Sequence, residues 1–153
     1  MNRKYLRLHA NKKQGLEIHR HFQAAMYQAA RARFAETNDE RLLHLDGAAH
    51  ELAFATRVQT KTNTCAVMRG YRINYLIVMI EKIISKIKND IPIKNIKNTI
   101  YICETKIGKM RYDIECDMSS VLNQVEKDNL IIYDREAKQE IEEELSLIKG
   151  GKS

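Results

Sequence analysis

Alanine and isoleucine divide this chain into two parts. Twelve of its thirteen alanines lie at or before Ala66, and seventeen of its eighteen isoleucines lie after it. Alanine favours helices and fills little volume, whereas isoleucine is bulky and β-branched, so the two parts must build different surfaces. The polar stretch 59–64 at the join is typical of a loop. We therefore predict a helical hairpin module over residues 1–60 and a second module over 61–153, which can share one core.

The first module has the periodicity of two helices. Between Lys13 and Ala35 the apolar residues follow a spacing of three and four, which places them on one stripe. Thr37 and Glu40 have the spacing of a capping box, so a second helix begins there and runs to about Val58. Gly47 lies in this second helix, and its small size permits a close approach to the first. The stripe of the first helix consists of Ile18, Phe22, Ala25, Ala29 and Ala32.

A third helix is predicted over residues 66–88, because apolar residues recur every three or four positions from Ile73 to Ile87. The β-branched residues of 73–80 leave a buried strand open as an alternative. The apolar surface extends around this helix, and leaving several large residues in water costs about 1.5–3 kcal/mol each. We therefore expect a homo-oligomer, with a dimer interface formed by Ile73, Ile77, Ile80 and Ile84.

The strongest strand signal lies between Thr99 and Cys116. Residues 110–116 alternate between apolar and polar, and Ile107-Gly108 fits a two-residue hairpin turn. In that register Glu104 faces Arg111. The fold class we predict is therefore α+β and helix-dominant, with an N-terminal helical hairpin, a third long helix and a small antiparallel β-hairpin. A mostly α fold and a winged-helix variant are the alternatives.

The remaining residues predict three short elements. Ser119 or Ser120 caps a short helix containing Val125, a strand follows over 130–133, and Asp134 caps an acidic C-terminal helix. The apolar stripe of that last helix consists of Ala137, Ile141, Leu145 and Ile148.

Charge is segregated along the chain. The net charge is +7 over residues 1–33, −3 over 34–60, +8 over 61–111 and −8 over 112–148. A basic segment of this density attracts polyanions, and aromatic rings between the bases can stack on nucleobases. On one predicted helix face Lys13, Arg20, Tyr27 and Arg31 fall close to one line. The predicted nucleic-acid interface consists of Arg3, Lys4, Arg7, Lys12, Lys13, Arg20, Tyr27, Arg31, Arg33, Lys109 and Arg111.

Motifs for nucleotide binding, zinc binding and metalloprotease chemistry are absent from the sequence. Asp46 and His50 are four residues apart, and with His44 they resemble part of a site, but we favour the interpretation that they are an ordinary helix-surface pair. We predict no catalytic residue, no metal and no cofactor. Three cysteines without a C-x-x-C motif indicate a reducing, cytoplasmic location. No apolar run approaches a membrane span, and we expect no membrane partner.

These observations predict a small, basic, non-enzymatic protein that binds nucleic acid through its N-terminal basic segment. The alternative is a protein-binding adaptor, inhibitor or assembly subunit, in which the charge-segregated surface meets an acidic protein partner.

Overall fold

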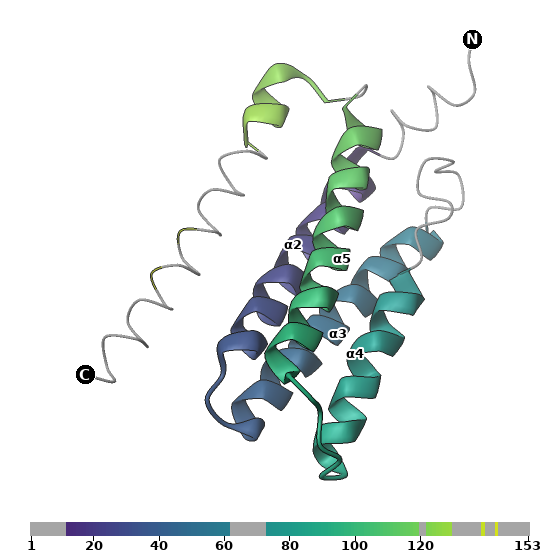
Figure 1. Cartoon of the computed structure of the whole chain (residues 1–153). Coiled ribbons are helices and arrows are strands. Elements are labelled where there is room, and N and C mark those ends of the chain that lie inside the picture. The colour runs from purple at the N-terminus through teal and green to yellow at the C-terminus, as the bar shows by residue number, and fades with distance from the viewer. Residues whose placement is uncertain (1–11, 62–72, 120–121, 130–138, 140–142, 144–153) are drawn as a thin grey trace. The chain divides into compact units, whose positions relative to one another are not determined.

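The computed structural model of the chain describes residues 12–61, 73–119, 122–129, 139 and 143 (Figure 1). Four long helices are formed: α2 (Lys12–Phe34), α3 (Asn38–Lys61), α4 (Ile73–Lys88) and α5 (Ile96–Met118). The chain divides into two compact units, Met1–Val121 and Leu122–Ser153, and all four helices belong to the first. Residues of both predicted modules therefore share one helical unit.

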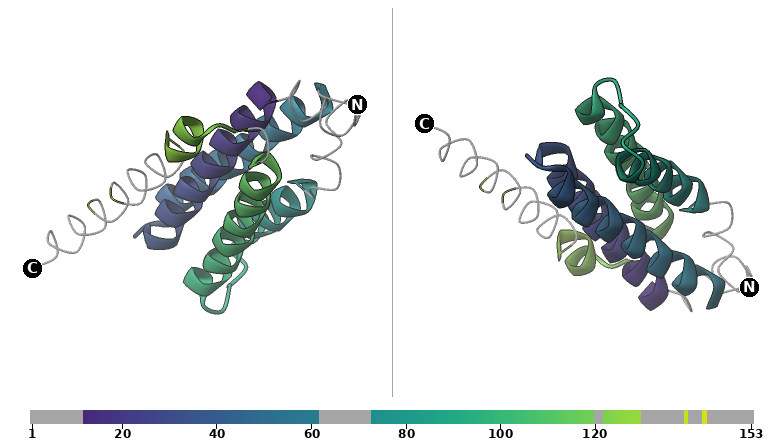
Figure 2. Two further views of the ribbon diagram at one scale, coloured as in Figure 1. Left: turned by 90° about the horizontal axis from the view of Figure 1, so that it is seen from above. Right: turned by 90° about the horizontal axis from the view of Figure 1, so that it is seen from below.

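Consecutive helices of this unit run in opposite directions (Figure 1). Helix α2 packs against both α3 and α5, and α3 also packs against α4, whereas α4 and α5 share the fewest contacts. The two further views show the α2–α3 pair beside the α4–α5 pair (Figure 2). Helix α2 thus holds the unit together, because it lies between α3 and α5.

The core contains most of its small residues on α2 and α3, together with Ile18, Phe22, Leu45 and Leu52, and large residues on α4 and α5. The predicted stripe of α2, from Ile18 to Ala32, is buried along its whole length. Gly47 of α3 packs close to Gln28 of α2, and an added Cβ would lie 3.2 Å from Gln28 Cδ. Alanine and glycine thus allow the close approach that the sequence indicated. The large, fully buried residues of the other two helices are Ile73, Leu76, Ile80, Ile100, Ile107, Ile114 and Met118.

The connection between α2 and α3 is fixed by caps at both sides. The Glu40 backbone N–H donates to Thr37 Oγ1 at 3.2 Å, which confirms the predicted cap. The buried Arg41 side chain donates to the Ala32 and Ala35 carbonyl oxygens, at 3.3 and 2.7 Å. These carbonyls lie at the end of α2, where no further turn of helix can satisfy them. Arg41 therefore ties the first turn of α3 to the last turn of α2.

The predicted β-hairpin and the α+β fold class are wrong, since residues 99–116 lie within α5 and no described residue is in a strand. The winged-helix variant requires the hairpin, so it is wrong as well. The mostly α alternative agrees with the structure. The residues of α5 that are buried recur with helical spacing: Ile100, Cys103, Ile107, Ile114 and Met118.

The alternation over residues 110–116 does not reflect a strand with one buried face. Of its apolar members only Ile114 is buried, and Tyr112 and Cys116 are exposed. Glu104 and Arg111 do not pair as predicted, because Glu104 contacts Arg33 of α2 instead. A seven-residue alternation is therefore overridden by a helical period that continues through 23 residues.

The connection between α4 and α5 contains two non-glycine residues in the left-handed region, Asp90 and Asn95, each with φ of 53°. Asn95 is the N-cap of α5, and its side chain accepts a hydrogen bond from the Asn98 backbone N–H at 3.2 Å. Asparagine and aspartate tolerate this conformation better than other non-glycine residues do. The reversal between the helices thus depends on their side chains.

In the second unit, residues 124–129 form a short helix, and Asn123 caps it by accepting from the Glu126 N–H at 2.9 Å. The serine cap predicted for this short helix is wrong, because Asn123 caps it and Ser119 lies at the C-terminal end of α5. The predicted cap Asp134 lies outside the described residues. The predicted strand over 130–133 and the stripe of the C-terminal helix lie outside the described residues, as does Cys65.

Candidate functional site

The predicted basic face of α2 contains one exposed arginine and one arginine that stacks on a tyrosine ring. Arg20 is exposed. The Arg31 guanidinium lies 4.2 Å from the centre of the Tyr27 ring and donates to the Tyr27 hydroxyl. Arg3, Lys4 and Arg7 lie outside the described residues, as do the side chains of Lys12 and Lys13. Their part in an interface stays a prediction.

Arg33 is a structural residue of the α2–α5 contact. Its Nε lies 2.9 Å from Glu104 Oε2, and its guanidinium lies 4.3 Å from the Phe34 ring and 4.9 Å from the Tyr101 ring. Burial raises the pKa of Glu104, and the Arg33 charge partly opposes this rise. Recruiting Arg33 to a ligand would leave this carboxylate without its partner, at considerable cost.

A second polar contact joins α2 to α5 further along. His19 is buried, and its Nε2 donates to Glu115 Oε1 at 2.7 Å. Arg111 lies beside the same carboxylate, with its Nε 4.0 Å from Glu115 Oε1. Both predicted site residues Arg33 and Arg111 therefore face carboxylates of their own chain.

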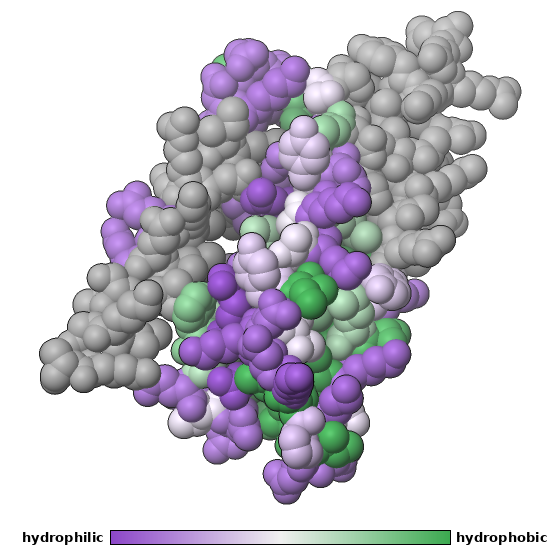
Figure 3. All heavy atoms as spheres, in the orientation of Figure 1, coloured by the Kyte–Doolittle hydropathy of each residue, from purple (hydrophilic) through white to green (hydrophobic). Residues whose placement is uncertain are grey.

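Five lysines around the α4–α5 connection differ from Arg33 and Arg111 in their exposure to solvent. All five are exposed, and none of their side chains has an ion pair or hydrogen bond with any residue in the part of the chain that the structure describes. Over residues 82–97 they are accompanied by one acid, Asp90, which gives this segment a net charge of +4. Figure 3 shows hydrophilic side chains gathered around this end of the molecule. We call Lys82, Lys86, Lys88, Lys94 and Lys97 the lysine cluster.

The outer face of α5 carries two exposed tyrosines. Tyr101 is 49% exposed and Tyr112 is 62% exposed. Lys97 and Lys109 are exposed on the same helix and have no partner among the described residues. A hairpin in the predicted register would place both tyrosines on one face with Ile114, whereas in α5 Ile114 is buried and both tyrosines are exposed.

The histidines of α2 and α3, His19, His21, His44 and His50, do not form a common site. His50 Nδ1 donates to the Asp46 carbonyl oxygen at 2.8 Å and lies 3.5 Å from Asp46 Oδ2, as the i, i+4 spacing predicts. His44 Nδ1 instead donates to Gln28 Oε1 at 2.8 Å, and His21 contacts Glu51. Among the described residues no three metal-binding side chains converge. The prediction that the chain is independent of metal awaits measurement.

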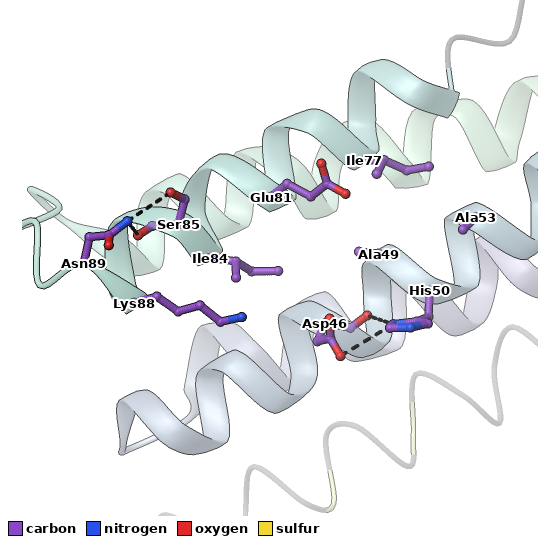
Figure 4. A pocket seen from close by; sticks show the side chains of 10 residues that line it. All are labelled: Asp46, Ala49, His50, Ala53, Ile77, Glu81, Ile84, Ser85, Lys88 and Asn89. Carbon is purple, nitrogen blue, oxygen red and sulfur yellow. Dashed lines mark hydrogen bonds and ion pairs between the residues drawn. The ribbon is translucent and has the colours of Figure 1, made fainter.

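Asp46 and His50 border a groove of about 500 Å³ between α3 and α4 (Figure 4). Its floor is apolar and its rim is polar. Of the predicted dimer residues, Ile73 and Ile80 are buried within the unit, whereas Ile77 and Ile84 line this groove. The lining is completed by Ala49, Ala53, Glu81, Ser85, Lys88 and Asn89.

Comparison with known protein families, with curated proteins and with solved structures finds no match to this chain. None of the helices in the described residues is long and apolar enough to cross a membrane. The features that bear on function are therefore the lysine cluster, the exposed face of α5 and the groove between α3 and α4.

Proposed function

We propose that the chain is a non-enzymatic nucleic-acid-binding protein that contacts phosphates through the lysine cluster. The observation that supports this proposal is the set of five exposed lysines without an intramolecular partner among the described residues. A surface of this kind binds any phosphate backbone, because the attraction is electrostatic and independent of sequence.

The distribution of partners favours lysines over arginines. Arg33, Arg41 and Arg111 all contact carboxylates or carbonyl groups of their own chain, and Arg31 stacks on Tyr27. Moving such a group to a ligand breaks an interaction that the fold uses. The lysines of the cluster stand on flexible stems in solvent and can reach a phosphate without that loss.

Acidic residues are outnumbered around this cluster. Over residues 82–97 Asp90 is the one acid, and Asp46 and Glu81 line the groove that Lys88 also borders. Glu36 lies between α2 and α3, and Asp39 and Glu40 lie in the first turn of α3, where all three are exposed. The net charge of +4 over residues 82–97 gives this segment a positive potential toward solvent.

The test is the salt dependence of binding to a short DNA duplex. Each phosphate contact contributes about −0.9 to the slope of log affinity against log salt concentration. If four or five lysines contact phosphates, the wild-type slope is about −4. Replacing Lys86, Lys94 and Lys97 with Gln should bring the slope to about −1, with an unchanged circular dichroism spectrum.

The matched control replaces Lys12, Lys13 and Arg20 with Gln, which removes the same charge from α2. We expect its slope to equal that of the wild type. An equal fall in both variants would contradict the lysine cluster as the site. Absence of any retardation of duplex or single-stranded DNA or RNA at 50 mM salt would refute nucleic-acid binding.

A second candidate is an adaptor that binds an acidic protein. The observation that favours it is the segregation of charge, with exposed acids at the start of α3 and exposed lysines around the α4–α5 connection, since such a dipolar surface matches a partner of opposite polarity. Poly-glutamate serves as the probe. If it binds as tightly as an oligonucleotide of equal charge, the adaptor is favoured over nucleic-acid binding.

A further inference from the structure

We propose that the outer face of α5 binds single-stranded nucleic acid by stacking bases on Tyr101 and Tyr112. This inference rests on the proposed function and specifies the form of nucleic acid that the protein selects. Base–aromatic stacking requires bases that are not already stacked in a duplex, so it distinguishes single strands from double strands.

The two rings lie on one side of the helix. Eleven residues separate them, and at about 100° per residue they differ by roughly 20° around the axis. At about 1.5 Å per residue they stand roughly 16 Å apart along α5. A stacked strand advances about 3.4 Å per nucleotide, so this distance corresponds to about five nucleotides. One strand can therefore reach both rings.

The same side of α5 supplies a charge beside each ring. Lys97 precedes Tyr101 by four residues and Lys109 precedes Tyr112 by three, the spacings at which helix side chains are neighbours. Both lysines are exposed and have no partner among the described residues. Lys97 also belongs to the lysine cluster, so the strand continues from one surface to the other.

The surroundings of the rings suit a phosphate-bearing ligand. Arg33 lies against the Tyr101 ring while its charge is engaged by Glu104, so the ring is held in place before a base arrives. Of the nearby acids, Glu115 contacts His19, and Asp113 lies about 100° around the helix from Tyr112.

The experiment compares a 15-nucleotide oligo-dT with a 15-base-pair duplex at one low salt concentration. Replacing Tyr101 and Tyr112 with Leu preserves bulk and removes the rings. Because one stacked base contributes about 5- to 150-fold in affinity, the double variant should bind oligo-dT at least 10-fold more weakly than the wild type. Its affinity for the duplex should be unchanged, and Phe at both positions should restore oligo-dT binding.

Tyr75→Leu is the matched control. Tyr75 is 53% exposed and also has a cation over its ring, because Lys106 Nζ lies 5.7 Å from the ring centre. Lys106 lies about 140° around α5 from Tyr101, so Tyr75 is on another side of the unit. This variant should bind both probes as the wild type does.

Each outcome decides between the two proposals. If the double Leu variant retains wild-type affinity for oligo-dT while the triple lysine variant loses affinity for the duplex, stacking is refuted and the lysine cluster stands. If the double variant loses affinity for both probes equally, the rings do not select single strands and the inference is overturned. If the wild type binds neither probe, the proposed function itself fails.

Discussion

Replacing Gly108 with Ala tests the fold and the side-chain packing together. Gly108 lies inside α5, where glycine costs about 1 kcal/mol relative to alanine. A Cβ at this position would lie 3.3 Å from Met26 Sδ and 3.5 Å from Met26 Cε. The thioether is unbranched and flexible, so Met26 can withdraw by the few tenths of an ångström required. We expect a net stabilisation of about 0.5–1 kcal/mol.

Urea denaturation followed by circular dichroism at 222 nm measures this change. At this chain length, 1 kcal/mol corresponds to roughly 4 °C in melting temperature, which calorimetry resolves. In a Met26→Ala background the contact is absent, so the gain from Gly108→Ala should rise toward 1 kcal/mol. The difference between the two backgrounds isolates the packing cost.

Gly47→Ala is the control, because it makes the same change in α3 against a fixed neighbour. Its Cβ would meet Gln28 Cδ at 3.2 Å, and Gln28 Oε1 already accepts from His44 at 2.8 Å. We expect little or no stabilisation there. If Gly108→Ala destabilises the protein in the Met26→Ala background as well, the helical assignment of α5 is refuted, because a glycine at positive φ in a hairpin turn behaves in that way.

Three further predictions concern the core and its titrating groups. Ile80→Ala should destabilise the protein by about 2–5 kcal/mol because Ile80 is fully buried; Ile77→Ala, at the groove, should cost clearly less in the same urea titration, and equal costs would contradict the assignment. Burial raises the pKa of Glu104, so the folded state binds its proton more tightly and this group contributes less stability as pH rises above about 4.5; Glu104→Gln should remove that contribution, so the wild-type free energy of unfolding should fall relative to the variant between pH 4 and 6. Burial also raises the pKa of Cys103; with the other cysteines replaced by serine, its thiol should react slowly with a disulfide reagent at pH 7 and rapidly in urea, and rapid reaction in the native state would contradict its burial.

The sequence predicts α2 and α3 well because their signals are long and redundant. The stripe from Ile18 to Ala32 spans four turns, and Thr37 marks the start of α3 independently of that stripe. Only the end of α3 was wrong, since the helix continues through Lys61 rather than stopping near Val58. A polar composition alone does not end a helix when each residue can still form its backbone hydrogen bonds.

The error in α5 came from giving a short pattern more weight than a long one. Residues 110–116 alternate, and tyrosine, isoleucine and cysteine are accepted in strands. The buried residues Ile100, Cys103 and Ile107 have helical spacing, but exposed Tyr101 and Ile102 lie between them and obscure it. Burial against α2 decided the outcome, and a single sequence does not reveal which face will be covered.

For the candidate site too, the sequence does not reveal which side chains are engaged by other parts of the fold. The charge of +8 over residues 61–111 was visible in the sequence. The pairing of Arg33 with Glu104 joins residues 71 positions apart, and that of His19 with Glu115 joins residues 96 apart. Without those contacts, arginines that face carboxylates of their own chain cannot be distinguished from exposed lysines, so the sequence alone does not rank the basic residues as ligand contacts.

The cap formed by Arg41 bears on the order in which the chain acquires its structure during synthesis. Its partners Ala32, Ala35 and Asn38 all precede it by nine residues or fewer. The turn between α2 and α3 can therefore close as soon as Arg41 has left the ribosome, before the isoleucine-rich helices α4 and α5 have emerged. Domains acquire structure from the N-terminus during translation. The α2–α3 pair then presents a surface against which α4 and α5 can pack as they emerge. This packing shortens the time for which the isoleucine side chains are exposed to water.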